Sequence, residues 1–167
     1  FPANRQSETQ STDPNGNVTI ALVDVDRAGR TVVRTTSRVG IAGKQVETLV
    51  NGLPVRALDF NGLLMSTQYD GLMRVSAVID SRGNATRTAY YTGSALKQSV
   101  TDAANHAIAT YGYDTSGRVI WQADALGHLT RTSYSLRAQP HRTWGGGTYP
   151  VEFGYDATFG DRTSQST

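Results

Sequence analysis

Apolar and polar side chains alternate in short runs along this chain, and clusters of turn residues separate the runs. Strands are expected at residues 18–25, 31–39, 46–50, 53–58, 118–123 and 129–134. In the run 118–123, Val119, Trp121 and Ala123 fall on one face because successive side chains of a strand point to opposite sides. The pattern therefore predicts strands with one drier face.

Turn signals lie between these runs. Asp13-Pro14-Asn15-Gly16 combines a fixed φ with residues that tolerate positive φ, and Asn51-Gly52 is typical of a tight hairpin. Pro54 follows that hairpin and cannot donate a ladder hydrogen bond. The strand at 53–58 is therefore expected at a sheet edge, or to begin late.

The segment from Tyr69 to Tyr134 contains the same pattern of residues twice, 44 residues apart. The matching positions are Tyr69 and Tyr113, Asp70 and Asp114, Arg74 and Arg118, Asp80 and Asp124, Gly83 and Gly127, and Tyr90 and Tyr134. Asp80, Asp102 and Asp124 stand 22 residues apart, so the structural unit has about 22 residues. Met73 stands where the other copy has Gly117, which leaves the geometry of that turn open.

The repeat extends over most of the chain. The run 26–30 matches the run 114–118 at an offset of 88 residues, and Tyr155-Asp156 begins a last copy with a wider turn, because its glycine comes one residue late. We therefore divide the chain into a polar arm at 1–12, without periodicity, and a repeat region at 13–167 that is less regular at 31–58 and 138–152. Because the chain begins at Phe1 without a methionine, we expect a processed piece or a segment of a longer protein.

A strand and a turn in each repeat predict an all-β protein, a long antiparallel meander of about eight strands. Such a sheet has two unpaired edges, which must be managed by curling, by closing or by adding more repeats. We accordingly expect a segment cut from a larger sheet to associate with copies of itself or to reside in a longer chain.

Composition narrows the function classes. Fourteen arginines and two lysines against 14 acids give a net charge of +2 and a pI near 9.1 without a basic run, which disfavours nucleic acid as a partner. Eleven of the 14 acids are aspartate, a residue suited to turns. The absence of cysteine excludes disulfides and thiolate metal sites, and no apolar run approaches the roughly 20 residues of a membrane span.

The series Tyr113-Asp114-x-x-Gly117-Arg118, Asp124-x-x-Gly127 and Tyr134 resembles the YD repeat of RHS proteins. The resemblance covers roughly residues 13 to 162 and includes Tyr69, Asp70, Arg74, Tyr155 and Asp156. It implies a large antiparallel sheet that spirals into a hollow shell, as in bacterial RHS proteins and insecticidal toxin complexes, where such shells enclose a toxic domain. Related repeats occur in teneurins at animal cell surfaces. The family's Asp-Pro-rich core motif with its self-cleaving aspartates has no counterpart here, so the resemblance implies a wall segment, secreted or at the surface of a bacterium.

Candidate chemistry is sparse. His106, His128 and His141 have no ligand spacing, and the aspartates stand singly at turn starts, so neither paired hydrolase carboxylates nor a calcium loop is expected. Calcium at Asp24 and Asp26 is the weaker reading. A Gly-x-Ser-x-Gly elbow is absent, and the run 145–147 lacks the lysine of a phosphate loop, which favours a link or bulge. We therefore expect no enzyme, no cofactor and no metal site.

The aromatic residues leave two functions open. The recurrent tyrosines are expected to pack between strands, whereas Trp144, which lies outside the period, and Trp121 are candidates for stacking on sugar rings. The first hypothesis is a non-enzymatic structural segment that encloses or displays a cargo encoded elsewhere. The alternative is a carbohydrate-binding or adhesive repeat module at the cell surface, with glycans as partners.

Overall fold

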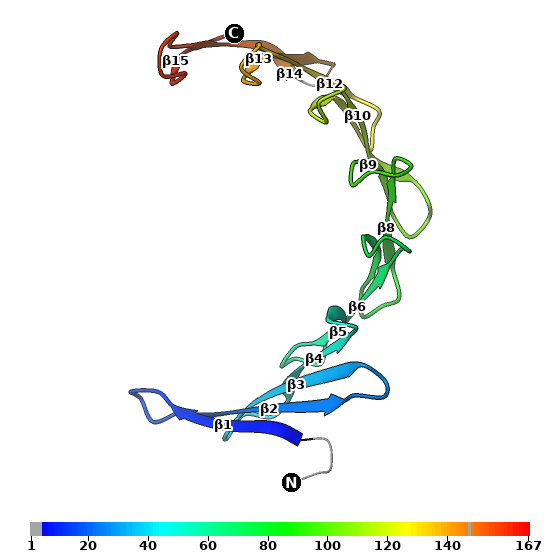
Figure 1. The fold of residues 1–167 in the computed structure, drawn as a ribbon, viewed down its shortest axis with the longest axis vertical. Helices are drawn as coiled ribbons and strands as arrows, with labels where there is room; N and C mark the ends of the chain where they lie inside the picture. The colour runs from blue at the N-terminus through cyan, green and yellow to red at the C-terminus, as the bar shows by residue number, and fades with distance from the viewer. Residues whose placement is uncertain (1–4, 147) are drawn as a thin grey trace. The chain divides into compact units, whose positions relative to one another are not determined.

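The computed structural model describes residues 5–146 and 148–167, and these residues form strands joined by turns (Figure 1). The strands of the first part are β1 Arg5–Thr12, β2 Val18–Asp26, β3 Thr31–Arg38, β4 Lys44–Val50, β5 Leu53–Leu58, β6 Leu64–Tyr69 and β7 Val75–Ile79. Those of the second part are β8 Ala85–Tyr90, β9 Lys97–Thr101, β10 Ala107–Tyr113, β11 Val119–Asp124, β12 Leu129–Tyr134, β13 Pro140–Gly145, β14 Thr148–Tyr155 and β15 Arg162–Ser166. The described residues include no helix of the length and hydropathy that a membrane span requires.

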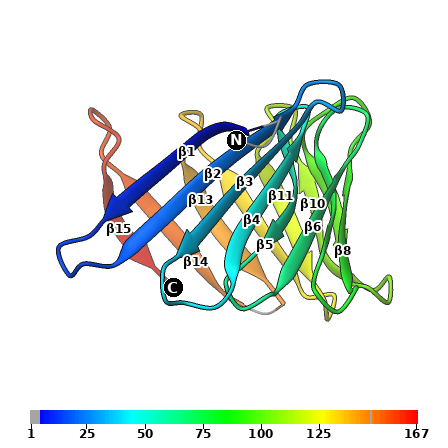
Figure 2. The ribbon, with the colours of Figure 1, turned by 90° about the horizontal axis from the view of Figure 1, so that it is seen from below.

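The first of two structural units, Phe1–Ala85, contains β1 to β7. Each strand pairs antiparallel with the strands next to it in the chain, from β1–β2 to β6–β7. Figure 2 shows β1, β2, β3 and β4 side by side, with turns at both ends. This unit is therefore a meander, as the alternation of strands and turns predicts.

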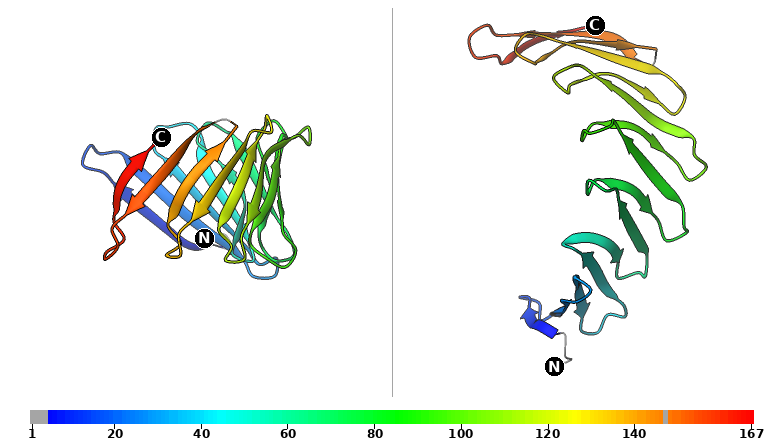
Figure 3. Two further views of the ribbon diagram at one scale, coloured as in Figure 1. Left: turned by 90° about the horizontal axis from the view of Figure 1, so that it is seen from above. Right: turned by 45° about the vertical axis from the view of Figure 1, so that its right-hand side comes forward.

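The second unit, Thr86–Thr167, holds β9 to β15 and all of β8 except Ala85. Its strands also pair antiparallel in chain order, and those drawn from yellow to red lie side by side (Figure 3, left). The expected all-β, antiparallel class is confirmed, and β5 and β12 have the predicted bounds.

The expected number of about eight strands is wrong, because the described residues form fifteen. Each sequence repeat of about 22 residues holds two strands and two turns. The strands β11 and β12, joined by the turn at Asp124, account for only one such unit. Counting one strand for each 22 residues therefore halved the sheet.

Part of the predicted polar arm is a strand. Residues 5–12 form β1, which pairs with β2 from Thr12↔Val18 onward, whereas residues 1–4 lie outside the described residues. The side chains of residues 6–12 are exposed, so this strand is held through its backbone and needs no alternation of apolar residues. Absence of periodicity did not exclude a strand here.

Pro54 is not at a sheet edge, and its strand does not begin late. The strand β5 begins at Leu53 and pairs with both β4 and β6. The register shifts beside the Leu49↔Pro54 pair, so a bulge accommodates the proline that cannot donate to the ladder. The less regular run 31–58 likewise forms three well-paired strands.

The strands of each unit form a single layer with very little core. Among the described residues only Ala77, Ala85 and Gly112 are buried, and no large side chain is fully buried. Large apolar side chains such as Leu126, Leu136 and Phe159 are instead exposed at turns. A domain normally buries the apolar side of a sheet against a second layer. The stability of this sheet must therefore come mainly from its turns and its strand pairing.

Candidate functional site

A recurring aspartate turn is the most regular local structure in the molecule. At Asp114 the backbone N–H donates to the Arg118 carbonyl at 2.9 Å, and the Gly117 N–H donates to the Asp114 carbonyl at 3.0 Å. Asp114 Oδ1 accepts hydrogen bonds from the N–H groups of Ser116 and Arg118 at 2.9 and 3.0 Å. An aspartate suits this position because its short carboxylate reaches the two amides that the turn leaves unpaired.

Six turns in the described residues share all four of these hydrogen bonds. They begin at Asp13, Asp59, Asp70, Asp80, Asp114 and Asp124.

The fourth residue of such a turn has positive φ, which glycine adopts without strain. Met73 nevertheless takes this conformation, with φ of 60°, and keeps the turn of its glycine counterpart Gly117. The question that the sequence left open at Met73 is therefore settled in favour of the same turn.

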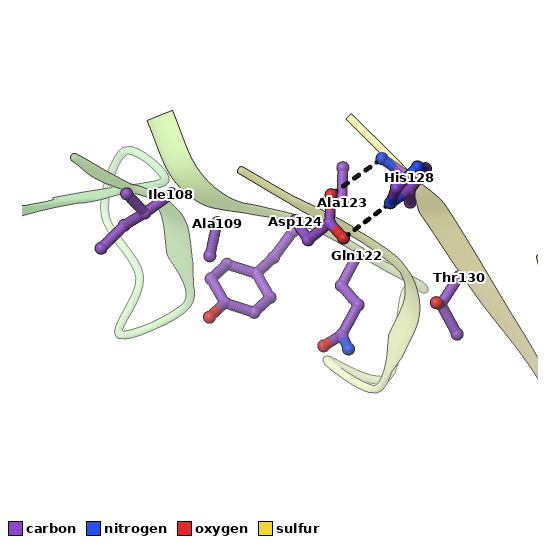
Figure 4. Close-up of a pocket in the computed structure, with 8 residues that line it drawn as sticks. Ile108, Ala109, Gln122, Ala123, Asp124, His128 and Thr130 are labelled. Carbon is purple, nitrogen blue, oxygen red and sulfur yellow. Dashed lines mark hydrogen bonds and ion pairs between the residues drawn. The ribbon is translucent and has the colours of Figure 1, made fainter. Parts of the chain in front are cut away.

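The fifth residue of each turn often returns its side chain to the second carboxylate oxygen. Arg74 Nε donates to Asp70 Oδ2 at 2.7 Å, Asn84 Nδ2 donates to Asp80 Oδ2 at 3.0 Å, and His128 Nδ1 lies 3.0 Å from Asp124 Oδ2 (Figure 4). Arginine, asparagine and histidine at the fifth position of the turn thus all contact the second oxygen of the turn carboxylate.

These hydrogen bonds hold the pKa of the turn aspartates below its ordinary value. At Asp70 the main cause is the side chain of Arg74, at Asp80 the side chain of Asn84, and at Asp114 the backbone N–H of Arg118. Each donor favours the charged carboxylate. The aspartates are therefore ionised groups engaged by their own turns.

The Asp124–His128 pair lines an open depression of about 310 Å³ with Tyr111, Gln122 and Thr130 (Figure 4). An aspartate beside a histidine can orient a general base. Asn84 makes the same contacts in the turn 44 residues earlier, however, so the pair is explained by turn geometry. The described residues contain no group of three or more potential metal ligands, and Asp26 Oδ1 accepts a turn hydrogen bond from Ala28 N–H.

A β-bulge precedes the tyrosine that ends every second strand from β6 to β14. The register shifts directly before Tyr69, Tyr90, Tyr113, Tyr134 and Tyr155. A bulge re-aims the side chain that follows it. The side chains of these tyrosines therefore do not follow the regular alternation of side chains between the two faces of the sheet.

The re-aimed hydroxyl closes the open end of a hairpin. Tyr134 Oη, at the end of β12, donates to the carbonyl of Val119 at the start of β11 at 2.9 Å. Tyr69 does the same to Pro54, and Tyr155 to Pro140, both at 2.8 Å. We call this hydrogen bond the tyrosine latch. Sequence reasoning missed the latch, although tyrosines spaced by 21 to 23 residues were its visible signal.

Arginines of the turns reinforce this arrangement. Arg118 forms an ion pair with Asp114 at 2.6 Å, and its guanidinium lies 4.8 Å from the ring centre of Tyr134. Arginine suits both contacts because its planar group pairs with carboxylates and stacks on aromatic rings. The repeat residues Asp114, Arg118 and Tyr134 thus form one series of contacts between the turn that precedes β11 and the end of β12.

Two further turns depart from the aspartate pattern. At Asp156 the N–H donates to the Asp161 carbonyl, one residue further along than usual, as the late glycine predicts. At Ser135 a hydroxyl replaces the carboxylate, and it accepts from the N–H groups of Arg137 and Gln139 at 3.3 Å. The turn is thus tolerant of shorter or weaker acceptors.

The structure places the two tryptophans on one face of the second unit. Gly112, Trp121, Arg131 and Trp144 are successive cross-strand neighbours on β10 to β13, so their side-chain positions share a face. Trp121 lies against Gly112, where a Cβ atom would overlap its indole. The Arg142 guanidinium lies 5.6 Å from the ring centre of Trp144. The register shifts between Thr143 and Gly145, and residue 147 of the predicted link or bulge at 145–147 lies outside the described residues.

Comparison with known proteins gives only distant likenesses. No family model and no curated protein matches the chain. Three solved structures that resemble it contain the protein TccC3. A TcdB2-TccC3-Cdc42 crystal structure has a TM-score of 0.42 and 14% identity, and a TcdB2-TccC3-TEV crystal structure has 0.32 and 12%. A Tc holotoxin pore of Photorhabdus luminescens, with a mutation in TccC3, has 0.28 and 12%.

The matches cover 95% to 97% of this chain but only 12% to 13% of the matched chains. The chain thus spans about an eighth of their length.

Proposed function

We propose that this chain is a non-enzymatic structural segment of a larger YD-repeat sheet, a shell or surface assembly of a bacterium. The larger sheet would enclose or display a cargo or toxin encoded elsewhere. The partners of the segment would be further repeats, in the same chain or in copies of it, outside the cell.

The observation that carries this proposal is the single layer of strands with almost no buried side chain. Ala77 and Ala85 are the only apolar side chains buried among the described residues. Met65, Ile108, Ile120 and Tyr149 lie on strands and remain more than one-third exposed. A sheet with this much uncovered apolar surface is typical of a part taken from a larger body.

The aspartates support a structural role. The carboxylates at Asp70, Asp80, Asp114 and Asp124 each accept hydrogen bonds from their own turn, and they recur with the repeat. A residue that recurs in every unit usually serves the folding of every unit. A turnover that a single aspartate substitution abolishes, without loss of folding, would contradict the non-enzymatic role.

Multi-angle light scattering tests the proposal that the chain is a segment. The 167-residue chain by itself should associate as its concentration rises, because its sheet edges and apolar side chains lack their neighbours. The intact protein, measured beside it, should give one defined mass. A segment that stays monomeric at high concentration would contradict the proposal.

Carbohydrate binding is the second candidate function. It is favoured by one observation, a depression in the second unit that three aromatic side chains surround.

A further inference from the structure

Three departures from the repeat meet at one place in the second unit. Tyr91 occupies the turn position that aspartate holds at Asp70 and Asp114. Gly112 and Trp121 stand where the first copy has a glutamine and an alanine, 44 residues earlier. Gly154 precedes Tyr155 as Gly112 precedes Tyr113, so a glycine at this position recurs. A recurrent residue serves the fold of every repeat, but Tyr91 and Trp121 are particular to this place.

The three residues surround an open depression of about 340 Å³. The ring of Tyr91 meets that of Tyr113 edge to face, with centroids 6.0 Å apart and planes at 86°. Tyr91 Oη donates to the Tyr111 carbonyl at 2.8 Å, which fixes the ring. Trp121 lies over the backbone of Gly112, and Leu96 completes the apolar lining. The aromatic surfaces are therefore held in place before any ligand arrives.

The fold does not require this arrangement. In the first copy, Gln68 and Ala77 form the corresponding cross-strand pair beside the same bulge, and Ala77 is only 4% exposed. The turn at Tyr91 is held without a carboxylate, since Ser94 N–H donates to the Tyr91 carbonyl and Ser94 Oγ accepts from Leu96 N–H, both at 3.1 Å. Gly112 leaves space for the Trp121 indole. Tyr91 lacks the carboxylate that accepts the turn hydrogen bonds at Asp70 and Asp114.

The polar groups around the depression favour an uncharged ligand. Asp114 is paired with Arg118 at 2.6 Å, so its charge is compensated. A Cβ atom at Gly112 would fall nearest to Trp121 Nε1, so the pyrrole side of the indole lies over this glycine. The Tyr91 hydroxyl donates its hydrogen to the Tyr111 carbonyl, and its oxygen can still accept a hydrogen bond.

We propose that the depression formed by Tyr91, Tyr113 and Trp121 binds a pyranose ring of a neutral oligosaccharide. A pyranose has an apolar face that packs on aromatic rings, and its rim of hydroxyls both donates and accepts hydrogen bonds. This matches the aromatic lining, the acceptor capacity of the Tyr91 hydroxyl and the compensated charge of Asp114. The site is independent of whether the sheet encloses a cargo.

Isothermal titration calorimetry on the intact protein tests the site, with chitohexaose, cellohexaose and maltohexaose as probes. At least one probe should bind saturably, and Trp121→Ala should weaken that binding about tenfold or more. Tyr91→Asp should weaken it similarly while restoring the usual turn residue, so its folding should be intact by circular dichroism. Phe159→Ala, at an exposed aromatic residue outside the depression, should bind as the wild type does.

Three results would overturn the site. They are no saturable heat with any of the three probes, binding that survives both Tyr91→Asp and Trp121→Ala, and competition by tetramethylammonium, which indicates a cation-binding aromatic cage. None of these results would change the mass measured by light scattering. Failure of the sugar site and failure of the structural role are therefore distinguishable.

Discussion

Met73 shows at the scale of one residue how the turn dictates the backbone. It adopts φ of 60° where the second copy has Gly117 with φ of 77°. The left-handed region costs a residue with a Cβ atom about 1 to 2 kcal/mol. The hydrogen bonds of Asp70 to the amides of Leu72 and Arg74 outweigh that cost.

Met73→Gly should therefore stabilise the protein, by up to about 1 kcal/mol once the greater freedom of glycine in the unfolded chain is subtracted. The reciprocal change Gly117→Met should destabilise it by about 1 kcal/mol. Urea unfolding of both variants measures the two effects. Equal stability of both variants and the wild type would show that φ at this position does not limit the turn.

Protonation of the turn aspartates gives a second prediction at this scale. The pKa of Asp70, Asp80, Asp114 and Asp124 is lowered from the ordinary 3.8 by turn hydrogen bonds. Between the folded and unfolded pKa values the unfolded chain binds more protons, so stability rises with pH there. The contribution should be complete above about pH 5 and should be lost as the pH falls below about 4.

Thermal unfolding followed by circular dichroism from pH 7 to pH 2.5 measures this loss. Asp114→Asn keeps the Oδ1 acceptor and removes the titrating group, so its melting temperature should fall less steeply in acid. A wild-type melting temperature that does not change through this range would contradict the proposed role of the carboxylates.

At the scale of the element, the bulge and the tyrosine latch organise each hairpin. The strands were predictable, because alternation and turn residues mark β5 and β12 directly in the sequence. The latch was not, because the contact between Tyr134 and Val119 depends on a register shift that only the partner strand defines. The strand β1 was missed because an exposed edge strand needs no apolar face.

Exchange of the cross-strand pair between the two copies tests the packing of one hairpin. Gly112→Gln should destabilise the protein by about 1 to 3 kcal/mol, because its Cβ atom overlaps the Trp121 indole. Adding Trp121→Ala recreates the Gln68/Ala77 pair of the first copy and should recover most of the loss. Urea unfolding of the single and double variants gives the coupling. Purely additive effects would contradict the packing described.

At the scale of the whole molecule, single-layer units with almost no core require other surfaces to cover them. The class of fold and the repeat could be predicted from the sequence, since an aspartate turn recurs along the chain, as at Asp70, Asp80, Asp114 and Asp124. The depression at Tyr91 and Trp121 could not, because Tyr91 in the turn after β8 and Trp121 on β11 lie 30 positions apart and line one depression only through the pairing of the strands between them. The number of strands could not be predicted from the sequence either, because one sequence repeat of about 22 residues contains two strands.

Electron microscopy of the intact protein that contains this chain tests the central claim most directly. We expect a larger sheet assembly in which this chain forms part of the wall, and a closed body with density inside would establish that the sheet encloses a cargo. An open ribbon that presents its strands to solvent would leave only the display role. Particles in which this chain forms an isolated domain, without neighbouring repeats or copies, would contradict the account.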